Sequence, residues 1–391
     1  MISTARAPQR TEADTSRVRA LDGVRGIAAL MVVVHHALQV DPTFARVQAE
    51  QSAAGESGVV WALTHTPLHI LWAGEEAVLV FFVLSGFVLA LPAMRGPIRW
   101  SAYYPRRLVR LYLPVWASLA AAVALKAALP VPGAGSGTSA WLAERAAAPL
   151  GEVWHDALLV DGAGLLNPPL WSLRWEVPFS LALPAYVLLL RRRRPALALL
   201  EVGALLTMIG VGTVTGSLAL RYLPVFGLGV LLALHQDRFA GLGPWVDARR
   251  FPRLAWATAA VGVACLLTAR WLVHGLPDAP RLAEAAASAA TIAGAVGALL
   301  LALHWRALRA GLERPAAQWV GTRSFSLYLV HDLAIVALAV LAAGAWGPWP
   351  AATVGAVLAL PVAAGFYHVV ERPSIALSRS ASRMVRRRQP A

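Results

Sequence analysis

The residues best suited to chemistry lie in the stretch GVRGIAALMVVVHH, residues 23–36, where an arginine and two histidines border an apolar run. Arg25 and His36 are eleven residues apart, about three turns of an α-helix, so their side chains share a face within roughly 20°. They are separated by about 16 Å along the helix axis, which is too far for direct contact. This spacing predicts one groove with the arginine at its mouth. If the apolar run crosses a membrane, the histidine lies near the middle of the bilayer.

Two histidines in an apolar helix require an explanation, because ionisable groups inside a membrane are costly and usually face a polar interior. One interpretation is a neutral imidazole that forms a hydrogen bond with a carbonyl group of a neighbouring helix. The other is a proton acceptor, a role that imidazole chemistry suits. The side chain of His35 is rotated by about 100° around the helix axis from that of His36, so the two histidines are expected to have different functions. The residues alone leave both interpretations of His36 open.

A second basic group, Arg106, Arg107 and Arg110, begins a later apolar segment in YYPRRLVRLYLPVW, residues 103–116. Guanidinium groups bind phosphate through a planar fork of donors. Arginines are also expected here because basic residues gather at the cytoplasmic ends of membrane helices. Both explanations are kept for this cluster, whereas the RRRR run at 191–194 is interpreted as a topology anchor.

Membrane helices are the elements that position these residues. The chain of 391 residues is 58% hydrophobic and only 14% charged, whereas soluble domains are about a quarter charged. Apolar segments long enough to cross a hydrocarbon core of about 30 Å recur along the chain, and helices satisfy the backbone inside them. We predict an all-α, polytopic transmembrane helical bundle with about ten spans, at 24–40, 76–93, 108–128, 172–190, 196–214, 218–235, 254–274, 284–304, 324–343 and 350–369.

Basic residues are distributed unevenly between the two sides of this bundle. If the spans alternate in direction, 28 of the 35 Lys and Arg residues fall on one side. The positive-inside rule makes that side cytoplasmic, with both termini on it and the protein in the plasma (inner) membrane. Topology and anionic headgroups of the lipid bilayer account for the net charge of +14, so no nucleic-acid partner is expected.

One transmembrane domain is predicted at 19–373, between a cytoplasmic tail at 1–18 and a basic cytoplasmic tail at 374–391. The first segment lacks a small-residue cleavage site and is not expected to be removed as a signal peptide. Cys265 is the single cysteine, so neither a disulfide framework nor a metal site is expected. No internal repeat stands out between the halves, which disfavours a transporter built on inverted repeats.

Six motifs occur in order along the chain: RALDGVRGIAALMVVVHH (19–36), VLVFFVLSGFVLALP (78–92), YYPRRLVRLYLPVW (103–116), WSLRWEVPFSLALP (171–184), SFSLYLVHDL (324–333) and VVERP (369–373). The ordered set resembles the acyltransferase 3 family of bacterial integral-membrane acyltransferases. The resemblance spans nearly the whole transmembrane part, and such a set is more specific than any one of its motifs.

The resemblance implies an enzyme that takes an acyl group, commonly acetyl, from cytoplasmic acyl-CoA, which is a co-substrate and not a bound cofactor. The acceptor is a hydroxyl group of a carbohydrate (a glycan) or of another small molecule. The family's arginine–ten residues–histidine signature maps onto Arg25 and His36, and its arginine pair maps onto Arg106, Arg107 and Arg110. These arginines are then expected to bind the phosphates of CoA, and His36 to act as the general base.

Two further motif residues are assigned to the catalytic site. Asp22 precedes Arg25 by three residues, a spacing that also suits an ion pair on one helix face. His331 lies beside Asp332 in the motif at 324–333. It is expected either to support the catalytic base or to make a structural hydrogen bond.

An acceptor site is predicted at the outer end of the fourth span, where WSLRWE places Trp171, Arg174 and Glu176. Aromatic rings suit the face of a sugar and a carboxylate binds hydroxyl groups, although tryptophans are also expected in the interfacial belt of a membrane protein. The chain departs from the family nearby: many members have an acidic residue before FFVLSGF, where residues 77–79 read AVL. Any acidic function there is missing or is taken over by Glu76.

A transporter or flippase for an anionic or acylated substrate is the alternative function, because it would use the same basic mouth and buried histidines. The acceptor class stays open among surface polysaccharide, peptidoglycan, a lipid-linked sugar and a secreted natural product.

Overall fold

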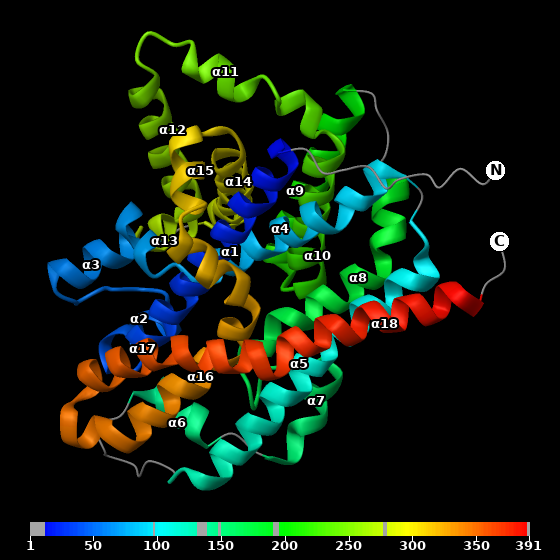
Figure 1. Cartoon of the computed structure of the whole chain (residues 1–391). Helices are drawn as coiled ribbons and strands as arrows, with labels where there is room; N and C mark the ends of the chain where they lie inside the picture. Colours follow the sequence, from blue (N-terminus) through cyan, green and yellow to red (C-terminus); the bar gives the residue numbers. More distant parts are fainter. Residues whose placement is uncertain are drawn as a thin grey trace.

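The fold is built from helices that differ widely in length (Figure 1). The computed structural model describes residues 12–96, 98–130, 139–147, 150–190, 195–276 and 280–388. The RRRR run at 191–194 lies outside these residues. The long helices are α1 (Glu12–Leu38), α4 (Gly74–Arg95), α5 (Trp100–Ala128), α8 (Leu170–Leu190), α9 (Pro195–Thr215), α10 (Leu218–Leu234), α12 (Pro252–Leu267), α14 (Arg281–His304), α16 (Pro315–Trp346), α17 (Pro348–Phe366) and α18 (Arg372–Arg388).

Short helical segments lie between the long helices. The short α-helices are α2 (Pro42–Glu50), α3 (Gly58–His65), α6 (Ala140–Ala146), α7 (Val153–Leu158), α11 (Leu242–Asp247), α13 (Ala269–His274) and α15 (Arg306–Leu312). The 3-10 turns are η1 (Pro67–Leu71), η2 (Leu150–Glu152) and η3 (Gln236–Phe239), and η4 (Tyr367–Glu371) is a π-helical turn.

Among the described residues, eight helices are long and apolar enough to cross a membrane. A ninth span results if α10 and the segment Gln236–Asp247, which meet at a bend of 70°, are taken together. The polytopic all-α bundle predicted from the sequence is confirmed. The predicted span at 254–274 is divided between α12 and α13, and the 16 residues of α12 cover about 24 Å, less than a full hydrocarbon core.

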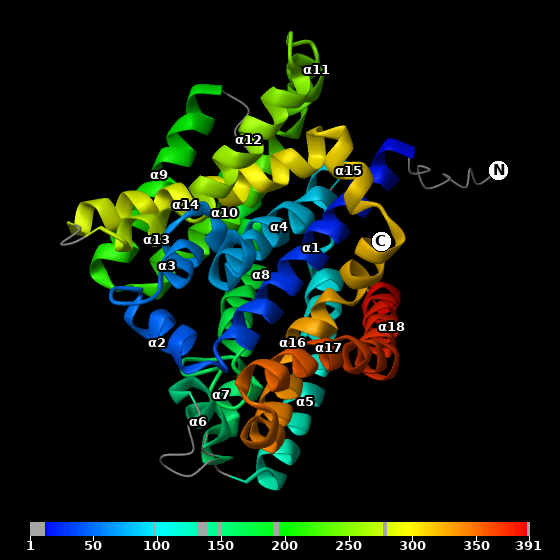
Figure 2. The same cartoon turned by 90° about the vertical axis from the view of Figure 1, so that its left-hand side faces the viewer.

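The described ends of the chain are helical. α1 begins at Glu12, so residues 12–18 of the predicted N-terminal tail extend the first helix. α18 continues through most of the predicted basic C-terminal tail and packs against α5. In Figure 2, the first turns of α1 and the helix α18 lie on the same side of the bundle.

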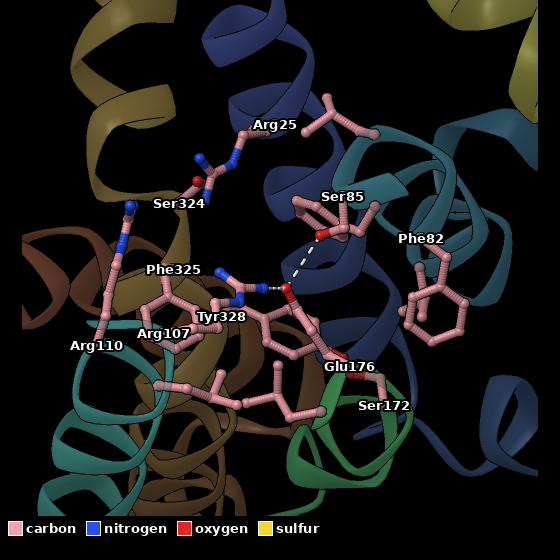
Figure 3. Close-up of a pocket in the computed structure, with 15 residues that line it drawn as sticks. Arg25, Phe82, Ser85, Arg107, Arg110, Ser172, Glu176, Ser324, Phe325 and Tyr328 are labelled. Atoms are coloured by element: carbon pink, nitrogen blue, oxygen red, sulfur yellow. Dashed lines mark hydrogen bonds and ion pairs between the residues drawn. The ribbon is translucent and has the colours of Figure 1, made fainter. Parts of the chain in front are cut away.

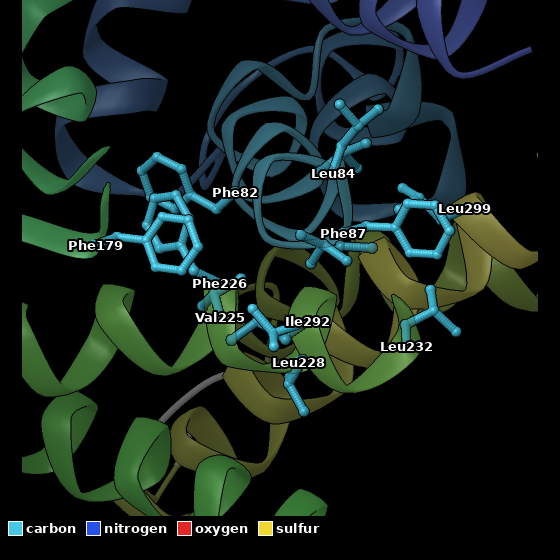
Figure 4. Packing of buried hydrophobic residues seen from close by; sticks show 14 of the residues in the cluster. Phe82, Leu84, Phe87, Phe179, Val225, Phe226, Leu228, Leu232, Ile292 and Leu299 are labelled. Atoms are coloured by element: carbon cyan, nitrogen blue, oxygen red, sulfur yellow. The ribbon is translucent and has the colours of Figure 1, made fainter. Parts of the chain in front are cut away.

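The largest apolar core lies where α4, α8, α10 and α14 meet (Figure 4). Phe226 of α10 stacks with Phe82 of α4 and with Phe179 of α8, at 4.5 and 4.3 Å between ring centroids. Gly86 and Gly229 permit the close approach of α4 and α10, because a Cβ atom on either glycine would overlap the facing backbone. This packing fixes α4, which forms one wall of the candidate site.

α1 and α16 pack closely and run in the same direction, because Gly26 meets Gly321 and, further along both helices, His36 meets His331. Gly26 lies against Gly321, where a Cβ atom on Gly26 would be 2.8 Å from the Gly321 nitrogen. Ten residues further along each helix, His36 meets His331. Because both helices rise by the same distance per residue, the glycine crossing sets the register in which these histidines meet.

Candidate active site

Two neighbouring cavities inside the bundle form the candidate site. The first, the arginine cavity, has a volume of ≈ 80 Å³, and its polar lining comes from Arg25, Ser85, Arg107, Arg110, Ser172, Glu176 and Ser324 (Figure 3). The second, the histidine cavity, has a volume of ≈ 180 Å³ and is lined by residues that include His35, His36, Gln39, Gln48, Glu75 and Arg145. Val78 and Tyr328 line both cavities, so a single wall separates them.

His36 is held through one nitrogen of its ring. Its Nδ1 atom lies 2.8 Å from Nε2 of His331 and 3.3 Å from Oδ1 of Asp332. On the far side of His331, Nδ1 is 3.0 Å from the carbonyl oxygen of Leu327 and 2.9 Å from that of Tyr328. Because carbonyl oxygens only accept hydrogen bonds, Nδ1 of His331 donates, and its Nε2 accepts from His36.

This bonding pattern fixes the tautomer of neutral His36. Its proton lies on Nδ1, which leaves Nε2 with a free lone pair. Nε2 has no hydrogen-bond partner among the described residues, and His36 lines the histidine cavity. An unprotonated nitrogen beside a polar cavity is what a general base requires.

The carboxylate beside His36 is held by a cation from a distant part of the chain. Asp332 is buried, and Nε of Arg145 lies 3.3 Å from its Oδ1 atom. The guanidinium group of Arg145 also packs over the ring of Trp141, at 4.5 Å from the centroid. A buried carboxylate needs a partner of this kind. Since the same Oδ1 faces His36, Asp332 can stabilise an imidazolium formed there.

His35 has a different role from His36. Its Nδ1 atom donates to the carbonyl oxygen of Trp72 at 3.0 Å, and its ring stacks on that indole at 5.7 Å. Gly74 lies directly against the ring, because a Cβ atom there would be within 3 Å of it. His35 therefore joins the last turn of α1 to the start of α4.

Arg110 concentrates positive charge in the arginine cavity. Its charge lies close to those of Arg25, Arg106 and Arg107, with Glu371 partly offsetting them. The guanidinium group of Arg110 forms no ion pair or hydrogen bond with any described residue, and the carboxylate of Glu371 accepts from the backbone and hydroxyl groups of one serine in α16. A largely buried guanidinium group without an ion pair favours an anionic ligand.

Glu176 lies in the arginine cavity, deeper than the outer end of its span where the sequence placed it. It accepts hydrogen bonds from Arg107 and, at 3.1 Å, from the hydroxyl group of Ser85 (Figure 3). The depth follows from α8, which begins at Leu170, six residues or about 9 Å before Glu176. Glu176 thus neutralises Arg107, Arg25 has a more distant carboxylate partner in Asp22, and Arg110 remains the cation without an ion pair.

The other two predicted acceptor residues are separated from Glu176. Trp171 lines the histidine cavity. Arg174 lies outside the linings of both cavities, where it pairs with the exposed Asp161 at 2.8 Å and packs over the ring of Trp175 at 4.6 Å. The three residues therefore lie in three places: Glu176 in the arginine cavity, Trp171 in the histidine cavity and Arg174 outside both.

Asp22 and Arg106 also lie outside the linings of the two cavities. Asp22 is 3.9 Å from Arg25 and fourteen residues before His36, which is about 21 Å along α1. Arg106 is exposed. His36 itself lies in the last turn of α1, nearer the end of the span than the sequence suggested.

Two charged lining residues, Arg145 and Glu75, were not assigned to the site from the sequence. Arg145 belongs to α6, which lies in a connector whose fold no motif reveals. The one sequence feature that could have pointed to Arg145 is that arginines are rare on the outer side of a membrane protein. Glu75 lines the histidine cavity and pairs with Arg270 at 3.2 Å. Glu76, the expected substitute for the family's acidic residue, is instead buried with its carboxylate 3.7 Å from Nε2 of His69.

A family model for an acyltransferase domain matches residues 18–368, and the chain belongs to the acyltransferase 3 family, as its motifs predicted. It is therefore a multi-pass membrane acyltransferase. It is similar to "Acyltransferase MdmB" of Streptomyces mycarofaciens, with 30% identity over 407 aligned positions that cover 92% of each chain. No solved structure matches this chain.

Proposed function

We propose that the protein transfers an acyl group, in the simplest case acetyl, from cytoplasmic acyl-CoA to a hydroxyl group of a carbohydrate or other small-molecule acceptor. The reaction takes place in the plasma membrane, with His36 as the general base. The observation that carries this proposal is His36, which lines one cavity and has a free Nε2 atom, while the unpaired guanidinium group of Arg110 lines the next cavity.

The donor binds with its phosphates at the arginine cavity. Coenzyme A has several phosphate charges at one end of a long, thin arm that ends in the thioester. Arg25 and Arg110 offer guanidinium groups that lack a strong partner, and charge-assisted bonds to phosphate are among the stronger hydrogen bonds in proteins. The arm then extends past Val78 and Tyr328, the wall common to both cavities, and brings the thioester to His36.

The transfer proceeds by direct attack of the acceptor. Nε2 of His36 removes the hydroxyl proton as the oxygen attacks the thioester carbonyl carbon, which gives a tetrahedral intermediate and an imidazolium. Asp332, 3.3 Å from Nδ1, stabilises that positive charge, while Arg145 and His331 hold the two partners in place. The C–S bond then breaks, and His36 returns the proton to the departing thiolate, which yields free CoA and the ester.

The acceptor approaches through the histidine cavity. Its lining includes residues of the connectors that follow α1 and α5, namely Gln48 of α2 and Arg145 of α6. In the topology expected from the basic residues, these connectors lie on the outer face. Trp171 and Glu75 supply an aromatic face and a carboxylate of the kind that bind hydroxylated rings.

The test is acyl transfer by the purified protein in lipid nanodiscs. Radiolabelled acetyl-CoA is mixed with a panel of glycans, lipid-linked sugars and hydroxylated natural products, and both acceptor label and free CoA thiol are measured. We expect equal amounts of ester and thiol with at least one acceptor. If no acceptor causes thioester cleavage, while a labelled acylated substrate crosses the bilayer of reconstituted vesicles, the protein is a transporter and the proposal is wrong.

A further inference from the structure

A second site lies away from the catalytic cavities, on the face formed by α11, α12 and α14. A groove of ≈ 800 Å³ runs between these helices, and its lining is predominantly apolar. None of its lining residues contributes to either cavity of the candidate site. Its exposed apolar side chains include Trp245, Phe251 and Leu254, so the groove presents an apolar surface to its surroundings.

Two arginines lie in the lining of this groove. The guanidinium carbon of Arg249 lies 3.7 Å from the centroid of the Trp245 ring, and that of Arg250 lies 5.2 Å from the centroid of Phe251. Neither guanidinium group forms an ion pair or a hydrogen bond with a described residue. The nearby carboxylate of Asp247 accepts a hydrogen bond from an indole. The groove is therefore apolar along its length, with two unpaired cations in its wall.

The walls of the groove are held firmly. The indole of Trp256 donates to Oδ1 of Asp247 at 2.8 Å, which joins α12 to α11. The same indole stacks in parallel on Trp305, at 5.8 Å between ring centroids and 5° between planes, which joins α12 to the end of α14. The groove is thus a preformed site.

The location of the groove matches the boundary between headgroups and acyl chains. Arg249 and Arg250 belong to the connector at 236–253, which the charge distribution places on the cytoplasmic side. α12 begins at Pro252, two residues after Arg250, and is too short to span the hydrocarbon core. An occupant must therefore be apolar where it faces α12 and α14, and anionic where it meets the arginines.

We propose that this groove is a binding site for an anionic phospholipid, with one acyl chain along α12 and α14 and the headgroup phosphate on Arg249 and Arg250. Basic pockets between membrane helices on the cytoplasmic side bind such headgroups. The two guanidinium groups are oriented by their aromatic partners, which lowers the entropy lost on binding phosphate.

The experiment measures lipid binding to the full-length, delipidated protein in detergent by native mass spectrometry. Phosphatidylglycerol and phosphatidylcholine with identical acyl chains are compared, each with and without inorganic phosphate as competitor. We expect phosphatidylglycerol to bind about 25-fold more tightly, since each basic residue near an anionic headgroup contributes about fivefold. The double variant Arg249→Gln/Arg250→Gln should bind the two lipids equally.

Two further variants separate the parts of the proposal. Thr258→Trp places a large ring in the groove and should weaken both lipids while the arginines stay in place. Arg379→Gln/Arg383→Gln removes the same charge from exposed positions on α18 and should leave the preference unchanged.

Three outcomes would overturn this proposal. A preference for phosphatidylglycerol that survives loss of Arg249 and Arg250 would place the lipid elsewhere. Displacement by inorganic phosphate at a concentration equal to that of the lipid would make this a simple phosphate site. Tighter binding of a long-chain acyl-CoA than of phosphatidylglycerol at this groove would assign it to the donor.

Discussion

The arginine cavity and the histidine cavity share a wall, yet they are built in different ways. Around the arginine cavity, Arg25, Arg107 and Arg110 come from the expected cytoplasmic ends of their helices, where a membrane protein has arginines for topological reasons. Around the histidine cavity, Arg145 and Asp332 are charged groups at positions where membrane proteins seldom have them: Arg145 belongs to a connector that we expect on the outer side, and Asp332 is buried.

This difference shows what each cavity is suited for. In the arginine cavity, Glu176 neutralises Arg107, whereas Arg110 has no paired carboxylate among the described residues. This arrangement suits an anionic ligand that binds and dissociates in each catalytic cycle. In the histidine cavity, each charged group near His36 has a fixed partner. The first arrangement supports binding and the second supports chemistry, so their variants should affect different kinetic parameters.

The largest effect is expected from His36→Ala. Loss of a general base lowers a rate by about 10²- to 10⁴-fold, so kcat for acyl transfer should fall about 10³-fold while KM for acetyl-CoA changes little. The measurement is steady-state transfer by the purified variant, with its thermal unfolding recorded alongside. Arg379→Gln, at an exposed position of α18 outside both cavities, is the control. Full activity in His36→Ala would remove this residue from the role of base.

A smaller loss, about 10²-fold in kcat, is expected from Arg145→Gln. The change leaves Asp332 without its cation, so the carboxylate is less able to stabilise an imidazolium at His36. KM for acetyl-CoA should stay within twofold. Arg145→Lys should recover part of the rate, whereas Glu144→Gln, at the neighbouring exposed position of α6, should have no effect. An increase in KM without a change in kcat would mean that Arg145 binds the donor, and the contrast between the cavities would not hold.

The opposite pattern is expected for Arg110→Gln. Hydrogen bonds to charged groups contribute about 1.5–3 kcal/mol, so KM for acetyl-CoA should rise about 10- to 100-fold with kcat little changed. Acetyl-pantetheine, which lacks the nucleotide and its phosphates, provides the comparison because its KM should be the same in both proteins. An equal loss with both donors would show that Arg110 does not bind phosphate.

The smallest effect is expected at the common wall. Tyr328→Phe removes the hydroxyl group that lies 2.7 Å from Oγ of Ser172 but keeps the ring between the cavities. One neutral hydrogen bond contributes about 1 kcal/mol, so kcat/KM should fall less than about tenfold in the transfer assay. A loss as large as that of His36→Ala would give the Tyr328 hydroxyl group a part in the reaction.

The sequence alone was sufficient to predict the class of fold and the part of the site that lies on α1. Hydropathy and the bias of basic residues predicted the helical bundle, and the spacing of Arg25 and His36 placed them on one face of α1. The sequence did not reveal that this face meets two cavities, because the dividing wall comes from Val78 on α4 and Tyr328 on α16.

The rest of the site depends on tertiary contacts that leave little trace in a single sequence. Arg145 reaches Asp332 from a short helix in a connector, and neither periodicity nor composition specifies where such a connector folds. Glu176 was placed with an acceptor because it follows two tryptophans, yet its partners on α4 and α5 bring it into the arginine cavity. Side chains near a helix end are the hardest to place, since a shift of one turn changes their depth by about 5 Å.

The central claim is that the two cavities receive their substrates from opposite faces of the membrane. Single cysteines at Ser85 in the arginine cavity and at Gln48 in the histidine cavity, in a Cys265→Ala background, test it most directly. An impermeant maleimide should label Ser85→Cys only from the cytoplasmic side, with coenzyme A slowing the reaction at least about fivefold, and Gln48→Cys only from the outer side without protection. Labelling of both positions from one face, or equal protection of both by coenzyme A, would contradict the account.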